Sequence, residues 1–308
     1  MAQQDLLEEI ERRLGRLRRV FDVSSLRGQG ATPEAIRRYY ERSRIGYRYV
    51  HCADGAMHMA LNPRGTFDRA GYEGQALLVH ERLAPGARDV LELACGNGYN
   101  LRLLAARNRG RRFVGVELIA SQVARARRTL AHLPDARALV GDFQALAFAD
   151  ETQDCVFVVE SLCHAIDLPR ALSEAARVLR PDGRFVVIDG WRTDAFDGLP
   201  AIVREATVAI ELAMAVSAGR SLSSWKSTAA RCGLRVTEEL DLTDQIVPNL
   251  ARLAAIAERF VSRPALARAA RFVAPDALLM NAVAAYLMPL AVQAGAHTYR
   301  LIVLERAS

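Results

Sequence analysis

The sequence contains almost no lysine. Only one of its 41 basic residues is lysine, Lys226, so arginine carries nearly all of its positive charge. A bias toward arginine and alanine is typical of a GC-rich genome, and we therefore do not interpret the net charge of +6 as a sign of nucleic-acid binding. The sequence also lacks the clustered basic and aromatic residues of RNA and DNA binders. We expect no nucleic-acid partner.

Cysteine is scarce, and its spacing excludes several kinds of site. The five cysteines lie at positions 52, 95, 155, 163 and 232. No two of them form a Cys-x-x-Cys pair, which argues against a zinc site or a disulfide framework and suits a reducing compartment. The sequence has no apolar run long enough for a membrane span, and its first residues are charged rather than typical of a signal peptide. We expect a cytoplasmic protein with no metal and no transmembrane segment.

A glycine-rich turn between a strand and a helix is the most informative segment. The run Val90–Leu93 is typical of a short apolar strand, and the turn Ala94-Cys95-Gly96-Asn97-Gly98 leads into helical sequence. Glycines lack a Cβ, so such a turn lets a ligand approach the main chain, as in the first strand–helix crossing of a Rossmann-like sheet. A dinucleotide-binding turn would have a third glycine where this sequence has Leu101. The turn instead resembles motif I of class I S-adenosylmethionine (SAM) methyltransferases, with Ala94 in place of their usual first glycine.

Four further strands follow at regular intervals. We expect them at residues 112–117, 138–140, 154–160 and 184–189. The first of these ends at Glu117, 19 residues after Gly98, where a carboxylate can accept hydrogen bonds from ribose hydroxyls. The alternative is that Glu117 is an acid at a helix N-terminus that interacts only with the helix dipole. The run Arg180-Pro181-Asp182-Gly183 predicts a turn before the last of these strands.

These ordered signals together resemble the class I SAM methyltransferases of the type 11 domain. The resemblance implies an α/β fold with a Rossmann-like seven-stranded sheet flanked by helices. It implies SAM as cofactor and S-adenosylhomocysteine as product, with Asp142 accepting from the adenine amine and Phe143 packing near the base. The cofactor-binding residues that it implies are Tyr40, Glu92, Ala94, Gly96, Gly98, Glu117, Leu118, Gln122, Asp142, Phe143 and Glu160.

Within this family the sequence resembles the sterol C-methyltransferases, and more loosely the tocopherol methyltransferases, over about residues 36–192. The segments that carry this likeness are Tyr39-Tyr40, His80–Ala84, Gln122, Gly141-Asp142-Phe143 and Glu160-Ser161-Leu162-Cys163-His164-Ala165-Ile166-Asp167. The sequence departs at Glu117, where the sterol enzymes commonly have Asn, and at Asp189–Arg192, which lacks their Tyr-Glu-Trp. The C-terminal third matches no sterol-enzyme motif. The likeness therefore supports the catalytic fold but does not establish a sterol substrate.

The sequence predicts additions on both sides of the methyltransferase core. We expect an N-terminal helical lid at 1–85, a SAM-binding core at 86–243 and 295–308, and a helical substrate cap at 244–294. In the lid, apolar residues at helical spacing predict an amphipathic helix over 5–22 whose stripe is Leu6, Ile10, Leu14 and Leu17. The last two strands, 234–240 and 298–304, would form a hairpin in this fold, but the helical segment separates them.

The segment Ala277–Leu290 is nearly continuous in apolar residues. A helix that is apolar on all sides must be buried, either within the protein or against an apolar ligand. Met280 and Tyr286 are our candidates for a substrate-facing wall. The alternative is a plain packed helix, and the sequence leaves both readings open.

His164 and Glu160 are the candidate catalytic residues. His164 follows the fourth strand at the carboxyl edge of the sheet, where ligands bind, and imidazole suits proton abstraction near neutral pH. A structural or capping histidine is the alternative, and Glu160 at the strand tip is the second candidate base. If the methyl acceptor is an alkene, the π faces of aromatic residues could stabilise the resulting cation. The candidates for this role are Tyr39, Tyr40, Trp191 and Tyr286.

The sequence thus predicts a SAM-dependent methyltransferase of an apolar small molecule. We favour C-methylation of an isoprenoid or related specialised metabolite. One alternative is O- or N-methylation of a natural product. Another is a non-methylating enzyme or a SAM-binding module on the same fold. A homodimer is left open.

Overall fold

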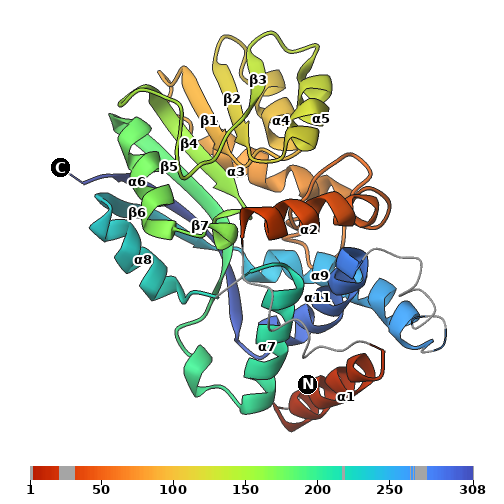
Figure 1. The fold of residues 1–308 in the computed structure, drawn as a ribbon. Helices are drawn as coiled ribbons and strands as arrows, with labels where there is room; N and C mark the ends of the chain where they lie inside the picture. Colours follow the sequence, from red (N-terminus) through yellow and green to blue (C-terminus); the bar gives the residue numbers. More distant parts are fainter. Residues whose placement is uncertain are drawn as a thin grey trace.

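One mixed sheet organises the molecule (Figure 1). The computed structural model describes residues 3–20, 32–216, 219–263, 265, 267 and 276–307. The strands are β1 (Asp89–Leu93), β2 (Arg112–Glu117), β3 (Ala136–Val140), β4 (Gln153–Val159), β5 (Leu179–Arg192), β6 (Leu234–Asp241) and β7 (His297–Arg306). They form a seven-stranded sheet in the order β3-β2-β1-β4-β5-β7-β6. The predicted Rossmann-like sheet is confirmed.

The order of the strands places a crevice at the carboxyl edge of the sheet. Strands β1 to β5 are parallel, and β7 runs antiparallel to both β5 and β6. The neighbours β1 and β4 are not successive in the chain, so the direction of winding reverses between them. In open parallel sheets ligands bind at such a reversal, beyond the carboxyl ends of the strands.

Helices cover both faces of the sheet, which explains why its central strands are apolar throughout. One face packs against α3 (Gly74–Arg82), α4 (Tyr99–Arg107) and α5 (Ala120–Leu130), and the other against α6 (Leu168–Val178) and α8 (Leu222–Arg231) (Figure 1). Successive side chains of a strand point to opposite faces. In β4, Phe157 therefore belongs to the first core cluster, whereas Val156 and Val158 belong to the second.

A second group of helices lies beyond the carboxyl edge of the sheet (Figure 1). Its members are α1 (Gln3–Arg18), α2 (Pro33–Gly46), α7 (Ala201–Ala213), α9 (Thr243–Val261) and α11 (Asp276–Gln293). A π-helical turn, Tyr47–His51, continues α2, and short 3-10 turns occupy Arg69–Glu73, Leu162–His164 and Phe196–Gly198. The predicted stripe of α1 is confirmed, since Leu6, Ile10, Leu14 and Leu17 are all buried. As predicted, α9 and α11 lie between β6 and β7 in the chain.

Helix α11 combines the two readings that the sequence left open, a packed helix and a pocket wall. Val283 and Leu287 are buried in a third core cluster with α1 and α7, but Ala282, Ala285 and Met288 border a cavity. One side of the helix is therefore core and the other a pocket wall. None of the described helices has the length and apolar character needed to cross a membrane.

The two residues that we predicted to face substrate lie on the core side of α11. Met280 packs against the third core cluster, and Tyr286 is fully buried in it. The guanidinium of Arg13 lies 4.6 Å from the centre of the Tyr286 ring, and Arg16 Nη1 donates to the Tyr286 hydroxyl at 3.1 Å. The prediction that Tyr286 and Met280 form the substrate wall was wrong. Helix α1, which could not be placed against α11 from sequence, covers this side.

Candidate active site

Three adjoining pockets lie at the carboxyl edge of the sheet, and Glu160 lines all of them. We call the first the strand-edge pocket, because it is bordered by the turns after β1, β2 and β3 around Gly96, Glu117 and Asp142. The second, the tryptophan pocket, is lined by Trp191 and Trp225. The third, the cap pocket, lies between α9, α11 and the segment that runs from α2 to Met59. The three spaces thus meet at Glu160, and Met57 also lines all of them.

The strand-edge pocket collects nearly every residue that the sequence singled out. The predicted residues that line it are Tyr40, Glu92, Ala94, Gly96, Glu117, Leu118, Gln122, Asp142, Phe143, Glu160 and His164. Gly98 is the exception. It begins α4 in a left-handed conformation, φ 77°, and a Cβ there would lie 3.2 Å from Ala126 Cβ in α5. Gly98 therefore serves the close packing of two helices, and we correct its predicted ligand contact.

The main chain of the first turn is left-handed at two points that border the pocket. Gly96 has φ 53°, and a Cβ on it would lie 3.3 Å from Gln122 Oε1 and 3.4 Å from Met57 Sδ. Ala94 also has φ 53°, although it is not glycine. A left-handed L-residue costs roughly 1–2 kcal/mol. The turn therefore holds a strained conformation in order to bring its main chain to the pocket.

The carboxylate of Glu117 connects two turns of the pocket. Its Oε2 accepts from the backbone N–H of Gly96 at 3.0 Å, and its Oε1 accepts from that of Ile119 at 2.9 Å. Burial raises the pKa of Glu117, against the opposing effect of these two hydrogen bonds. Because each carboxylate oxygen has more than one acceptor site, Glu117 can still accept from ligand hydroxyls.

Glu92 has an unused acceptor beside the same pocket. Its Oε1 accepts from Asn100 Nδ2 at 3.0 Å, but its Oε2 is buried and has no hydrogen-bond partner among the described residues. Burial raises the pKa of Glu92 to about 8. A buried acceptor without a partner is costly, so this site suits a ligand that brings a donor or a positive charge. Together with Glu117, the pocket fits a cationic ligand that also carries hydroxyls.

Glu160 is held in a conformation that leaves one oxygen free. It follows β4 in a left-handed conformation, φ 47°. Its Oε1 accepts from the Met59 backbone N–H at 2.7 Å and from the Tyr299 hydroxyl at 2.7 Å, and no described residue donates to its Oε2. Burial raises the pKa of Glu160 to about 7. A carboxyl group with such a pKa can exchange a proton near neutral pH, as a general base must.

His164 lies beside Glu160 but is less suited to take a proton. Its Nε2 is 2.9 Å from the Tyr40 hydroxyl, which links it to α2. Burial lowers the pKa of His164 to about 4, so the ring is neutral and only weakly basic near neutral pH. The geometry and the two pKa values favour Glu160 over His164 as the base, the reverse of our ranking from sequence. The predicted pKa of histidine assumed exposure to water, which burial removes.

The tryptophan pocket contains charged residues that sequence reasoning missed. Asp189 is buried at the carboxyl end of β5, where it accepts from the backbone N–H groups of Leu162 at 3.0 Å and Gly190 at 2.8 Å. Burial raises the pKa of Asp189 to about 6. Arg192 forms a two-pronged ion pair with Glu211 of α7. Only Asp189 carried a usable signal, since an acid after a buried strand lies at the ligand-binding edge.

The cap pocket is almost entirely apolar. It has a volume of about 300 Å³. Its apolar walls come from α9 and α11, through Leu250, Leu253, Ile256, Ala257, Phe260, Leu279, Ala282, Ala284, Ala285 and Met288. Tyr39 and Tyr47 close it from the side of the lid. Met57 and Met59, which follow the turn Tyr47–His51, also line it and had no signal in the sequence.

Helix α2 and the turn Tyr47–His51 that follows it are hydrogen-bonded to both α11 and α9. The Tyr39 hydroxyl donates to Asn281 Oδ1 of α11 at 2.5 Å, and Arg252 Nη2 of α9 donates to the carbonyl of Val50 at 2.7 Å. Of the aromatic residues that we predicted around a cation, Tyr39, Tyr40 and Trp191 line the tryptophan pocket. Tyr286 does not. Helix α2 thereby covers both the strand-edge and the tryptophan pockets.

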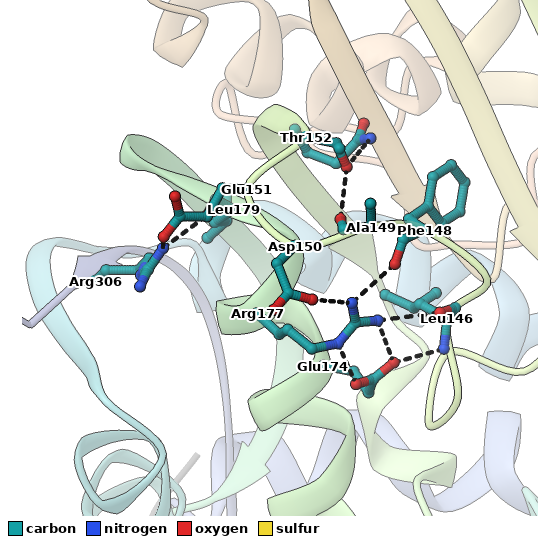
Figure 2. Close-up of polar contacts among 11 residues, drawn as sticks. Leu146, Phe148, Ala149, Asp150, Glu151, Thr152, Glu174, Arg177, Leu179 and Arg306 are labelled. Carbon is teal, nitrogen blue, oxygen red and sulfur yellow. Dashed lines mark hydrogen bonds and ion pairs between the residues drawn. The ribbon is translucent and has the colours of Figure 1, made fainter.

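The loop after β3, which forms one wall of the strand-edge pocket, is fixed from α6 (Figure 2). Arg177 donates to the carbonyls of Leu146 at 3.0 Å and Phe148 at 2.8 Å, and to Asp150 Oδ1 at 2.7 Å. Glu174 pairs with Arg177 and accepts from the Leu146 backbone N–H at 2.7 Å. These hydrogen bonds raise the pKa of Arg177 and keep the loop in one position.

Comparison with known proteins agrees with this geometry. Residues 91–187 match the family model described as a methyltransferase domain. The S-adenosyl-L-methionine-dependent Diels-Alderase iccD of Talaromyces variabilis is 29% identical over 234 residues, which cover 71% of this chain and 79% of that protein. Sterol methyltransferase-like 2 of Botryococcus braunii is 35% identical over 162 residues, which cover 48% of this chain but only 39% of that protein.

Solved structures show the same fold. The geranyl diphosphate C-methyltransferase of Streptomyces coelicolor A3(2), solved with Mg²⁺, geranyl diphosphate and S-adenosyl-L-homocysteine, aligns with a TM-score of 0.64 at 20% identity. The alignment covers 91% of this chain and 99% of that one. The domain match, the sheet order and the strand-edge pocket lead to one conclusion. Residues 91–187 therefore belong to a class I SAM-dependent methyltransferase domain, with SAM as its cofactor.

Proposed function

We propose that the protein methylates an apolar small molecule at carbon, with Glu160 as the base that removes the proton. The observation that carries this proposal is the position of Glu160, with its raised pKa of about 7, where all three pockets meet. One pocket fits the cofactor and the other two enclose a mainly apolar space. A proton released there would have Glu160 Oε2 as its acceptor.

The strand-edge residues would hold SAM. Glu117 would accept from the ribose hydroxyls, Glu92 would receive the amino group at its unpaired oxygen, and Asp142 with Phe143 would enclose the adenine. Gly96 would pass its main chain along the methionine part. When bound, SAM supplies an electrophilic methyl carbon on a sulfonium, so the protein need only align the acceptor and accept a proton.

The lid and the cap would define where the substrate lies. Helix α2 and the turn Tyr47–His51 cover the strand-edge and cap pockets, and α9 and α11 form the apolar walls. Apolar walls exclude water from the site. The exclusion of water strengthens polar interactions inside the site and protects a reactive cation from reaction with water. Tyr39, Tyr40 and Trp191 could stabilise such a cation through their rings.

Two features favour an isoprenoid-like acceptor. The cap pocket is apolar and large enough for a hydrocarbon arm, since ligand pockets of about 300–1,000 Å³ hold drug-sized molecules. Two of the proteins that resemble this chain are named for a sterol and for geranyl diphosphate. A base with a pKa near 7 would also serve O- or N-methylation, which keeps a natural product with a hydroxyl or amine as the alternative acceptor.

A non-methylating cyclisation is the second candidate. The Diels-Alderase of Talaromyces variabilis is matched over 79% of its length, whereas the sterol methyltransferase-like protein is matched over 39%. A cyclase would use the same enclosed apolar space to fold its substrate and would leave the methyl group of SAM in place. Binding of SAM therefore does not distinguish the two functions, but the fate of its methyl group does.

The deciding experiment is incubation with SAM labelled in its methyl group and an extract of the source organism. We expect an apolar product that carries the label, formed by the wild-type chain and lost in Glu160→Gln. Glu151→Gln is the matched control, because this exposed acid pairs with Arg306 away from the pockets (Figure 2). A product that changes in the presence of the protein but carries no label would instead establish the cyclase.

A further inference from the structure

The charged side chains of the tryptophan pocket differ in whether they have partners. Arg192 and Glu211 neutralise one another, and His297 Nε2 lies 3.5 Å from Glu211 Oε1. Asp189 is satisfied by backbone N–H groups. Arg220 is the remaining charged side chain of this pocket besides Glu160. No described carboxylate forms an ion pair with its guanidinium.

Among the described residues, the side chain of Arg220 has one hydrogen bond, and it is long. Its Nη2 donates to the carbonyl of Ala165 at 3.5 Å, near the limit for such an interaction. In the described part of the chain no carboxylate lies within ion-pair distance of it, although the side chain is partly buried. An arginine has five N–H donors and keeps its charge at any ordinary pH. None of its nitrogens is among the buried atoms that lack a partner, so these donors are open to water, which a ligand oxygen can replace.

The main chain at Arg220 is held in a defined position. The backbone N–H of Arg192 donates to the carbonyl of Arg220 at 3.0 Å. At the preceding residue, a Cβ on Gly219 would lie 1.9 Å from Glu211 Oε1, so this main chain is pressed against the ion pair. The segment therefore enters the wall of the tryptophan pocket at a defined place. A binding group on a fixed backbone loses less entropy when a ligand arrives.

We infer that Arg220 binds a carboxylate at one end of the substrate, whose hydrocarbon end occupies the cap pocket. The two pockets share Met214 and Met288, and both contain Glu160, so one molecule can extend through them past the base. A planar guanidinium binds a carboxylate through two parallel hydrogen bonds. The substrate class is thus an apolar acid, an inference that rests on the proposed function for its use of these pockets.

Tryptophan emission gives a test that does not depend on turnover. The chain has two tryptophans, Trp191 and Trp225, and both line the tryptophan pocket. The full chain, saturated with S-adenosylhomocysteine, is titrated with dodecanoate, with dodecanol and with dodecylammonium while the emission is followed. We expect dodecanoate to bind about tenfold or more tightly than dodecanol, as for a charge-assisted hydrogen-bonded pair, and dodecylammonium to bind most weakly.

Variants assign this preference to Arg220. Arg220→Gln should remove it by weakening dodecanoate about tenfold while leaving dodecanol unchanged, and Arg220→Lys should retain part of it. Arg235→Gln is the control, because its exposed side chain lies on β6 and pairs with Glu305. Calorimetric binding of S-adenosylhomocysteine by Arg220→Gln checks that the variant is folded.

The inference is overturned if dodecanol binds as tightly as dodecanoate, or if Arg220→Gln keeps the wild-type preference. It is also overturned if dodecanoate causes no saturable change in emission. These outcomes are separate from those of the labelled-methyl experiment. A carboxylate preference without methyl transfer would leave the inference standing and remove only the proposed methylation.

Discussion

The strand-edge pocket and the cap pocket meet at Glu160, yet they are built in opposite ways. The strand-edge pocket is made by short turns that follow successive strands, and its key contacts join residues such as Gly96 and Glu117. The cap pocket is made by segments from distant parts of the chain, as in the hydrogen bond from Tyr39 to Asn281. The first needs particular residues in a fixed backbone, whereas the second needs only apolar volume. Substitutions should therefore separate cofactor binding from substrate use.

The largest effect is expected from Gly96→Val. Gly96 has φ 53°, and its missing Cβ leaves space beside Gln122 Oε1 and Met57 Sδ, so a branched side chain would strain the backbone and fill the pocket. We expect loss of measurable SAM binding by calorimetry. Gly198→Val is the matched control, since a Cβ there has no neighbour within 4 Å. Tight SAM binding by a folded Gly96→Val would contradict the assignment of this turn.

Glu160→Gln should affect turnover rather than cofactor affinity. Glutamine can still accept from Met59 and Tyr299 but cannot take a proton, so turnover should fall by about 10²–10⁴-fold. Turnover of the wild type should rise with pH through about 7, the pKa of Glu160, because the base must be ionised. The measurement is a pH–rate profile for the labelled-methyl reaction. Wild-type turnover in the variant would return the base role to His164 or to another residue.

Met288→Gln tests the cap pocket, and Met280→Gln on the same helix is its control. Met288 lines the cap and tryptophan pockets, whereas Met280 packs on the core side of α11. Placing an amide against an apolar ligand should cost about 1–2 kcal/mol and raise KM about tenfold, with SAM affinity unchanged. Met280→Gln should lower the melting temperature but leave KM unchanged. Equal effects of the two variants on KM would mean that α11 acts only as a packed helix.

The smallest effect is expected from Tyr299→Phe. The Tyr299 hydroxyl donates to Glu160 at 2.7 Å and stabilises its ionised form. Removing this donor should raise the pKa of Glu160, so the rising limb of the pH–rate profile should move upward by about one unit, with an unchanged plateau. The rate at low pH would fall and the rate at high pH would not. A lower plateau with an unmoved limb would show that Tyr299 supports the fold rather than the base.

The strand-edge pocket could be predicted from the sequence because its information is local. Each apolar strand ends in a turn or an acid, and parallel strands bring their carboxyl ends to one edge of the sheet. Gly96, Glu117 and Asp142 could therefore be placed near one another without knowledge of the rest of the fold. Gly98 shows the limit of this reasoning. Its glycine is required by the approach of α5, which the spacing of the motif does not reveal.

The sequence by itself determined the sheet, the crevice at its carboxyl edge, and the helical insertion between β6 and β7. Only the tertiary structure decided which side of α11 faces the cap pocket, because its apolar residues surround the helix and carry no directional signal. Our proposal of Glu160 rather than His164 as the base also depends on the tertiary structure. Burial lowers the pKa of His164 to about 4 and raises that of Glu160 to about 7, and burial is a property of the whole fold rather than of neighbouring residues.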